Sequence, residues 1–174
     1  MKFTSIISLT IVAIMSSGCT VKHAQNNAEF RQMTPSNSYG KHEAFTINNT
    51  YSNAVSNFKK RSEACLNTAV VLKSYDRNTG AKIAGEQTLT YTPTLTVGSN
   101  KSELSVQKNV SGAGMIMGKV PENGMYIFLA DIAKDGKKSR LDVYYITYMG
   151  TDQILNSVKN WASGTSLDCP DLTK

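Results

Sequence analysis

Histidine is scarce in this chain, which contains only His23 and His42 among 174 residues. Both lie in a polar N-terminal stretch without a sustained apolar period, so neither is expected to be held near a nucleophile. A serine hydrolase needs such a positioned base, and the sequence also lacks the G-x-S-x-G turn of many hydrolases. The sequence therefore predicts a protein that is not an enzyme.

Cofactor and metal motifs are also missing. No C-x-x-C pair is present, and two distant cysteines, Cys65 and Cys169, without a nearby histidine do not make a tetrahedral metal site. The pair Gly118-Lys119 resembles part of a phosphate-binding loop, but Ala113 stands where the motif needs glycine and Val120 where it needs Ser or Thr. We expect no cofactor and no metal.

Acidic residues that could serve as the acid and base of a glycosidase are spread along the chain, and their pattern marks no pair. Most lie near expected turns or at solvent-facing strand positions: Glu86, Glu103, Glu122, Asp131, Asp135 and Asp142. A cell-wall hydrolase is therefore the weakest of three functional hypotheses.

The N-terminus has the order of an export signal. Lys2 precedes an apolar run over 3–15, which is too short for a membrane span, and Ser16, Ser17 and Gly18 lead to Cys19. This pattern resembles a bacterial lipobox, which implies that residues 1–18 are removed and that Cys19 receives a diacylglyceryl thioether. The alternative is an ordinary cleaved signal peptide with an incidental cysteine.

The resemblance also implies a cellular location. Two or three acyl chains on Cys19 would hold the protein firmly in a bilayer. Thr20 follows where an Asp would favour retention in the inner membrane, so the resemblance implies the outer membrane of a Gram-negative cell. We expect the domain to face the periplasm, with the cell surface as the alternative.

The remaining cysteines form an even pair. With Cys19 assigned to lipid, Cys65 and Cys169 are left in an oxidising compartment, where such a pair predicts a disulfide. The basic excess, 19 Lys and Arg against 13 Asp and Glu, is scattered and indicates a solvated surface rather than nucleic-acid binding.

Composition divides the mature chain into two parts. Residues 19–44 combine the acylated cysteine with a polar segment containing Pro35 and Gly40, and they are predicted to be a flexible tether spanning roughly 25 to 30 Å. Residues 45–174 are long enough for one domain with its own core.

Local patterns predict the elements of this domain. A 3.6-residue apolar stripe indicates a helix over about 50–66, with Thr50 among the N-cap candidates. Alternating segments follow, the clearest being a hairpin around KDGKK at 134–138, and a last helix begins near Thr151 and ends at Gly164. This order predicts an α+β fold: helix, antiparallel sheet of about five or six strands, helix.

The outline resembles small Gram-negative lipoproteins of unassigned function. The features shared are the lipobox, the polar tether, the helix ending near Cys65, the sheet, and a terminal W-x-x-G followed by a cysteine (Trp161, Gly164 and Cys169). The resemblance implies a lipoprotein with a structural disulfide, and it transfers no catalytic residue.

Tyrosines gather around the predicted hairpin, at Tyr126, Tyr144, Tyr145 and Tyr148. They are expected either to cover the sheet or to form a partner-binding face, for which Tyr126, Tyr144 and Tyr148 are the candidates. The leading hypothesis is a lipid-anchored binding or structural component of an envelope assembly or secretion machine. The alternative is an inhibitor or immunity-type protein that neutralises a lytic enzyme.

Overall fold

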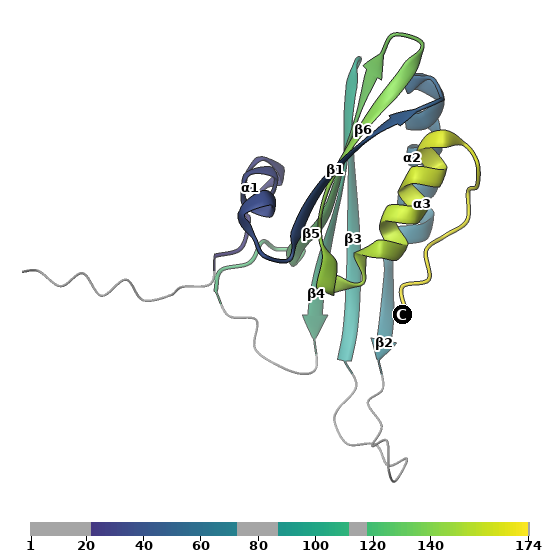
Figure 1. Cartoon of the computed structure of the whole chain (residues 1–174). Coiled ribbons are helices and arrows are strands. Elements are labelled where there is room, and N and C mark those ends of the chain that lie inside the picture. Colours follow the sequence, from purple (N-terminus) through teal and green to yellow (C-terminus); the bar gives the residue numbers. More distant parts are fainter. Residues whose placement is uncertain (1–21, 73–86, 112–117, 174) are drawn as a thin grey trace, which may run out of the picture.

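The computed structural model describes residues 22–72, 87–111 and 118–173. They form a six-stranded antiparallel sheet with α2 and α3 on one face and the short α1 on the other (Figure 1). The α+β class predicted from the sequence is confirmed, and so is the disulfide between Cys65 and Cys169, whose sulfur atoms are 2.08 Å apart. The predicted signal peptide, 1–18, and Cys19 lie outside the described residues.

The helices are α1 (Asn27–Met33), α2 (Tyr51–Leu66) and α3 (Thr151–Ser163), with short 3-10 turns η1 (Thr34–Ser36) and η2 (Thr147–Met149). The strands are β1 (Gly40–Ile47), β2 (Thr68–Leu72), β3 (Gln87–Val97), β4 (Lys101–Ser111), β5 (Met125–Asp135) and β6 (Lys138–Ile146). In the described ranges no helix combines the length and the hydropathy needed to cross a membrane.

The sheet has the spatial order β1-β6-β5-β4-β3-β2. Strands β2 to β6 form a meander, and α2 carries the chain across the sheet from β1 at one edge to β2 at the other (Figure 1). Strand β6, the second arm of the predicted hairpin, is therefore paired on both sides, with β5 and β1. It is an interior strand of the sheet and not an edge strand.

Helix α2 follows its sequence signals closely. The Thr50 side chain accepts a hydrogen bond from the backbone N–H of Asn53 at 3.3 Å, which satisfies one donor that the first turn leaves free. Phe58, Cys65 and Leu66 of the predicted apolar stripe are buried against the sheet. Burial of this stripe supplies most of the helix's stability, because intrinsic propensity contributes little in a helix of this length.

Helix α3 begins at Thr151, as the sequence predicts. Gly150 occupies the N-cap position, and the Thr151 hydroxyl donates to the carbonyl of Ile146 instead of capping the helix. The predicted end at Gly164 is correct, and the Trp161 side chain is fully buried between the helix and the sheet. The indole N–H of Trp161 donates to the carbonyl of Asp168 at 2.9 Å, which fastens the C-terminal segment beside the disulfide.

The predicted tether is wrong for residues 27–44. Asn26 caps α1 by accepting from the backbone N–H of Glu29, and β1 pairs with β6 along its whole length. Gly40 is not a sign of flexibility: a Cβ there would lie 1.9 Å from the carbonyl oxygen of Thr34, so the close approach of η1 to β1 requires glycine. The ordered fold thus begins close to the predicted acylation site.

Candidate functional site

The sheet has one well-covered face and one largely open face. Tyr91, Leu104, Ile132 and Val143 point into the main core under α2 and α3. Because side chains alternate along a strand, their neighbours point the other way. We call this second surface the open face; its polar members include Thr90, Thr92, Thr94, Thr96, Lys101, Glu103, Ser105, Gln107, Asp131, Arg140, Asp142 and Tyr144.

Three carboxylates form a row across the open face. Glu103 on β4 pairs in register with Asp131 on β5, and Asp131 pairs with Asp142 on β6. Side chains directly opposite one another in an antiparallel pair are close neighbours, and like charges in such positions repel. The row therefore needs cations to balance it.

Arg31 of α1 supplies the first of these cations. Its Nε and Nη2 donate to the two carboxylate oxygens of Asp131 at 2.7 and 2.6 Å, and Nη2 also lies 2.6 Å from an oxygen of Glu103. Asp131 is buried, with a side chain 8% exposed, whereas Arg31 is 22% exposed. We call this group the Arg31 latch, because it fixes α1 onto the open face through charge-assisted bonds.

Lys101 and Asn27 complete the latch. The Lys101 ammonium lies 3.3 Å from Glu103 and 3.1 Å from Asp131, and the Asn27 amide donates to the other oxygen of Glu103 at 3.3 Å. Burial raises the pKa of Glu103, but the bonds from Arg31 and Asn27 and the charges of Arg31 and Lys101 outweigh it and hold that pKa below its ordinary value. Hydrogen bonding to Asp131 raises the pKa of Arg31, so this guanidinium stays charged.

The third carboxylate, Asp142, has separate partners. Arg140 donates to its two oxygens at 2.9 Å each, and His42 Nε2 lies 3.3 Å from one of them. Burial raises the pKa of Asp142, and the bonds from Arg140 and His42 outweigh that effect and lower it. The His42 ring stacks on Tyr144, with centroids 4.3 Å apart and planes 7° from parallel.

This arrangement is suited to recognition and to holding α1. Each carboxylate of the row is engaged by at least one cation, and the lowered pKa values keep Glu103 and Asp142 ionised, which suits charge pairing rather than proton donation. The residues that the structure describes contain no group of three or more His, Cys, Asp and Glu side chains placed to hold a metal ion.

Beside the latch lies a shallow hollow of about 490 Å³. Its walls come from α1 with its N-cap residue and from β3, β4 and β5: Asn26, Asn27, Ala28, Arg31, Thr94, Glu103, Ser105 and Tyr126. The hollow is wide open to solvent, which distinguishes it from the concave pockets that enclose most of a small ligand.

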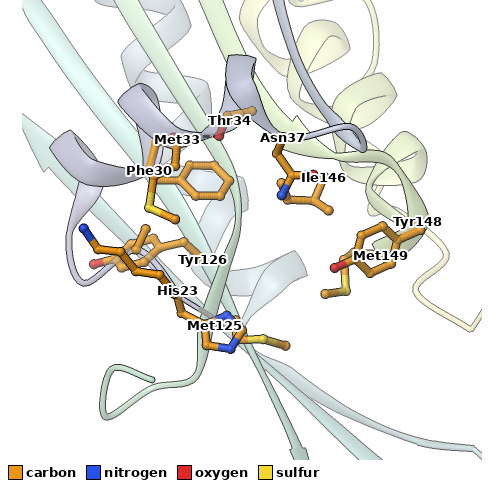
Figure 2. Close-up of a pocket in the computed structure, with 12 residues that line it drawn as sticks. His23, Phe30, Met33, Thr34, Asn37, Met125, Tyr126, Ile146, Tyr148 and Met149 are labelled. Carbon is orange, nitrogen blue, oxygen red and sulfur yellow. Dashed lines mark hydrogen bonds between the residues drawn. The ribbon is translucent and has the colours of Figure 1, made fainter. Parts of the chain in front are cut away.

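A smaller pocket of about 80 Å³ lies under α1 at the end of the sheet where the described chain begins. Figure 2 shows Phe30 and Met33 from α1 on one side and Tyr148 and Met149 on another, with Met125 at the far end. Its volume is well below that of a typical small-molecule site, which is roughly 300 to 1,000 Å³. We call this pocket the notch; its lining includes three methionines, Met33, Met125 and Met149, whose side chains are flexible.

The three candidate tyrosines all lie on the side of the sheet that carries α1, whereas Tyr145 points into the main core. Tyr126 packs against Phe30 with ring centroids 6.0 Å apart, and Tyr144 stacks on His42. Tyr148 is 60% exposed on η2, beyond the end of β6, and not on the strand as expected. Tyr145 donates a hydrogen bond to Glu43, which together with burial raises its pKa.

Sequence reasoning missed the latch completely. It found no marked acidic pair, yet Glu103 and Asp131 are strand neighbours joined by one guanidinium. Arg31 lies in the predicted tether, where the sequence indicates no partner for it. The capping order of Asn26 and Glu29 before Phe30 was the one local signal that could have revealed α1.

Comparison with known proteins adds little. No family model matches the chain, and no curated protein matches it. Among solved structures, the Mll3558 protein from Rhizobium loti is similar, with 12% sequence identity over 73% of this chain and 99% of that chain. The TM-score of 0.28 is too low for this likeness to carry an argument about fold or function.

Proposed function

We propose that this protein is a non-enzymatic lipoprotein of the outer membrane that binds a protein of the cell envelope through the open face of its sheet. The observation that supports this most directly is the unequal covering of the sheet. Helices α2 and α3 cover one face, whereas among the helices of the described residues only α1 rests on the other. The part of this face that α1 leaves exposed is available to a partner, and it carries groups suited to that role.

Its chemistry supports a protein partner rather than a small ligand. Thr90, Thr94 and Thr96 on β3 are exposed and offer hydroxyls along one line, and Tyr144 on β6 is half-buried on the same face, with β4 and β5 between it and β3. Protein interfaces combine polar groups of this kind with aromatic contact area. The hollow next to Thr94 is open enough to receive a side chain from a partner.

The ion pairs add specificity. The charges of the row are held in place before any partner arrives, so binding would not need to order them. Exposed members such as Arg140 and Lys101 can steer a partner of complementary charge toward the face.

The anchor belongs to the proposal because of the lipobox-like sequence ending at Cys19. An assembly subunit needs to be held at the membrane, whereas an inhibitor of a lytic enzyme works free in the periplasm. The two functions therefore differ in their need for acylation.

The test is site-specific photo-crosslinking in intact cells. A photoreactive residue replaces Thr94 on the open face, and the matched control replaces Lys60, which is exposed on α2 over the other face of the sheet. Each is placed in the natural protein and in a Cys19→Ala variant that is exported without lipid.

A single envelope protein crosslinked from Thr94 but not from Lys60, and only with Cys19 intact, would support the proposal. Equal capture with and without Cys19 would favour the inhibitor. No adduct from Thr94, or the same adducts from both positions, would overturn the binding role of the open face.

A further inference from the structure

The notch under α1 belongs to a larger exposed patch. Tyr39 and Tyr148 are 56% and 60% exposed, the two highest values among the large hydrophobic side chains that the structure describes. Their rings meet edge to face with centroids 4.8 Å apart. Together with Met33, Met125 and Met149 of the notch they form what we call the tyrosine-methionine patch.

The beginning of the chain fixes where this patch lies relative to the predicted anchor. Lys22 and His23, the first residues that the structure describes, line the same notch. Cys19 lies three residues before Lys22, and consecutive Cα atoms are 3.8 Å apart, so the Cα atoms of Cys19 and Lys22 are at most about 11 Å apart. An acyl group on Cys19 would therefore hold this end of the domain at the bilayer.

The side chains of the patch suit that position. Tyrosine is enriched where membrane meets water, because its ring is apolar and its hydroxyl remains hydrated. Methionine is flexible and polarisable and adapts to irregular apolar surroundings. Lys22 and Lys119 are exposed nearby, where Gln25 bonds to the carbonyl of Lys119, and they can pair with lipid phosphates.

We propose that the tyrosine-methionine patch rests in the headgroup region of the bilayer that holds Cys19, so that the domain lies on the membrane and does not project from it. This inference rests on the acylation of Cys19 in the proposed function. Its consequence is an orientation: the pocket end faces lipid, and the strand ends near Val97 face away from the membrane. The plane of the open face is then roughly perpendicular to the membrane, so a neighbouring envelope protein can reach this face.

Spin labels test this orientation in the full-length lipidated protein. Thiol labels are introduced by Tyr148→Cys and Tyr39→Cys, and by Val97→Cys as a control of comparable exposure, 44%. Val97 pairs with Ser102, whereas Met125 of the patch pairs with Lys108, six residues further along β4. That separation corresponds to about 20 Å along the strand. The disulfide and the acylated Cys19 leave the introduced cysteine as the reactive thiol.

The protein is reconstituted in vesicles of phosphatidylethanolamine and phosphatidylglycerol, and each label is tested for contact with oxygen, which enters lipid, and with a water-soluble nickel chelate. We expect the ratio of oxygen contact to chelate contact at 148 and 39 to be several-fold higher in the lipidated protein on vesicles than in the Cys19→Ala protein in buffer. The ratio at 97 should not change.

Mass spectrometry of the same samples separates the two possible failures. Full acylation with unchanged ratios at 148 and 39 would overturn the orientation and leave the anchor intact. A mass without lipid on protein recovered from cells would overturn both. If access of the chelate to the label at 148 in buffer falls as the protein concentration rises, a second copy of the protein covers the patch. This result would also overturn the proposal.

Discussion

The disulfide should account for a large part of the stability of this fold. Cys65 and Cys169 are 104 residues apart in the sequence, so the bond closes a long loop in the unfolded chain. In the chain-entropy treatment, a loop of this length restricts the unfolded state by about 4 to 5 kcal/mol at 25 °C. We predict that the double variant Cys65→Ala, Cys169→Ala loses that amount of unfolding free energy, which corresponds to roughly 10 to 20 °C in Tm for a domain of this size.

Trp161 provides the assay. It is the one tryptophan in the sequence, it is fully buried, and its indole N–H bonds to the carbonyl of Asp168, next to Cys169. Urea unfolding followed by its fluorescence reports the core and the C-terminal segment together. Circular dichroism reports the sheet and helices independently. Wild-type protein unfolded with a reducing agent should match the double variant, which controls for the change of side chain.

Two outcomes would contradict this role of the disulfide. If the double variant and the reduced protein lose less than about 1 kcal/mol by both probes, loop closure does not stabilise this fold as the entropy treatment requires. If fluorescence changes early while circular dichroism stays native, the bond holds only the C-terminal segment. That segment has further contacts of its own, because Leu172 is buried in the main core.

Three further predictions concern the open face and its helix. Arg31→Met should cost about 2 to 3 kcal/mol in urea unfolding, because it removes the bidentate partner of the buried Asp131; an unchanged midpoint would contradict the latch. The pKa values of Glu103 and Asp142 are lowered in the folded protein, so the stability that they contribute is present above their unfolded pKa of about 4 and is lost as the pH falls through the lower folded values. Glu103→Gln and Asp142→Asn should each reduce this loss of stability in acid, measured by denaturation at a series of pH values. If both variants lose stability with pH as steeply as the wild type, the prediction is refuted. Gly40→Ala should cost about 1 to 3 kcal/mol and loosen α1 in hydrogen exchange, because the new methyl group would overlap the backbone of η1; wild-type protection of α1 would show that η1 moves aside freely.

Much of the fold could be read from local patterns because the elements concerned are long and face one core. Helix α2 has a capping residue and a regular buried stripe, and α3 ends at Gly164 as its sequence indicates. In β6 the side chains alternate between the two faces, with Leu141 and Val143 in the main core and Tyr144 on the other face. One buried face imposes one period on the sequence, and that period is visible without the structure.

Strand β1 lacked such a signal. It is an edge strand whose side chains are mostly exposed or half-buried, so apolar residues such as Phe45 and Ile47 appear only near its end. Helix α1 has seven residues, with Phe30 as its buried member, which is too short for a recognisable stripe. Both elements depend on pairing with distant parts of the chain, and a polar composition concealed that pairing.

The sequence by itself determined the α+β class, the two long helices, the central hairpin and the pairing of the two cysteines, because these depend on local periodicity and on the parity of cysteines. Only the tertiary structure decided the Arg31 latch and the row of Glu103, Asp131 and Asp142. Arg31 and Asp131 are 100 residues apart in the sequence, and they meet because α1 docks at one register of the sheet. Such a register is set by hydrogen bonds between strands and by packing against both faces, and no local pattern encodes it.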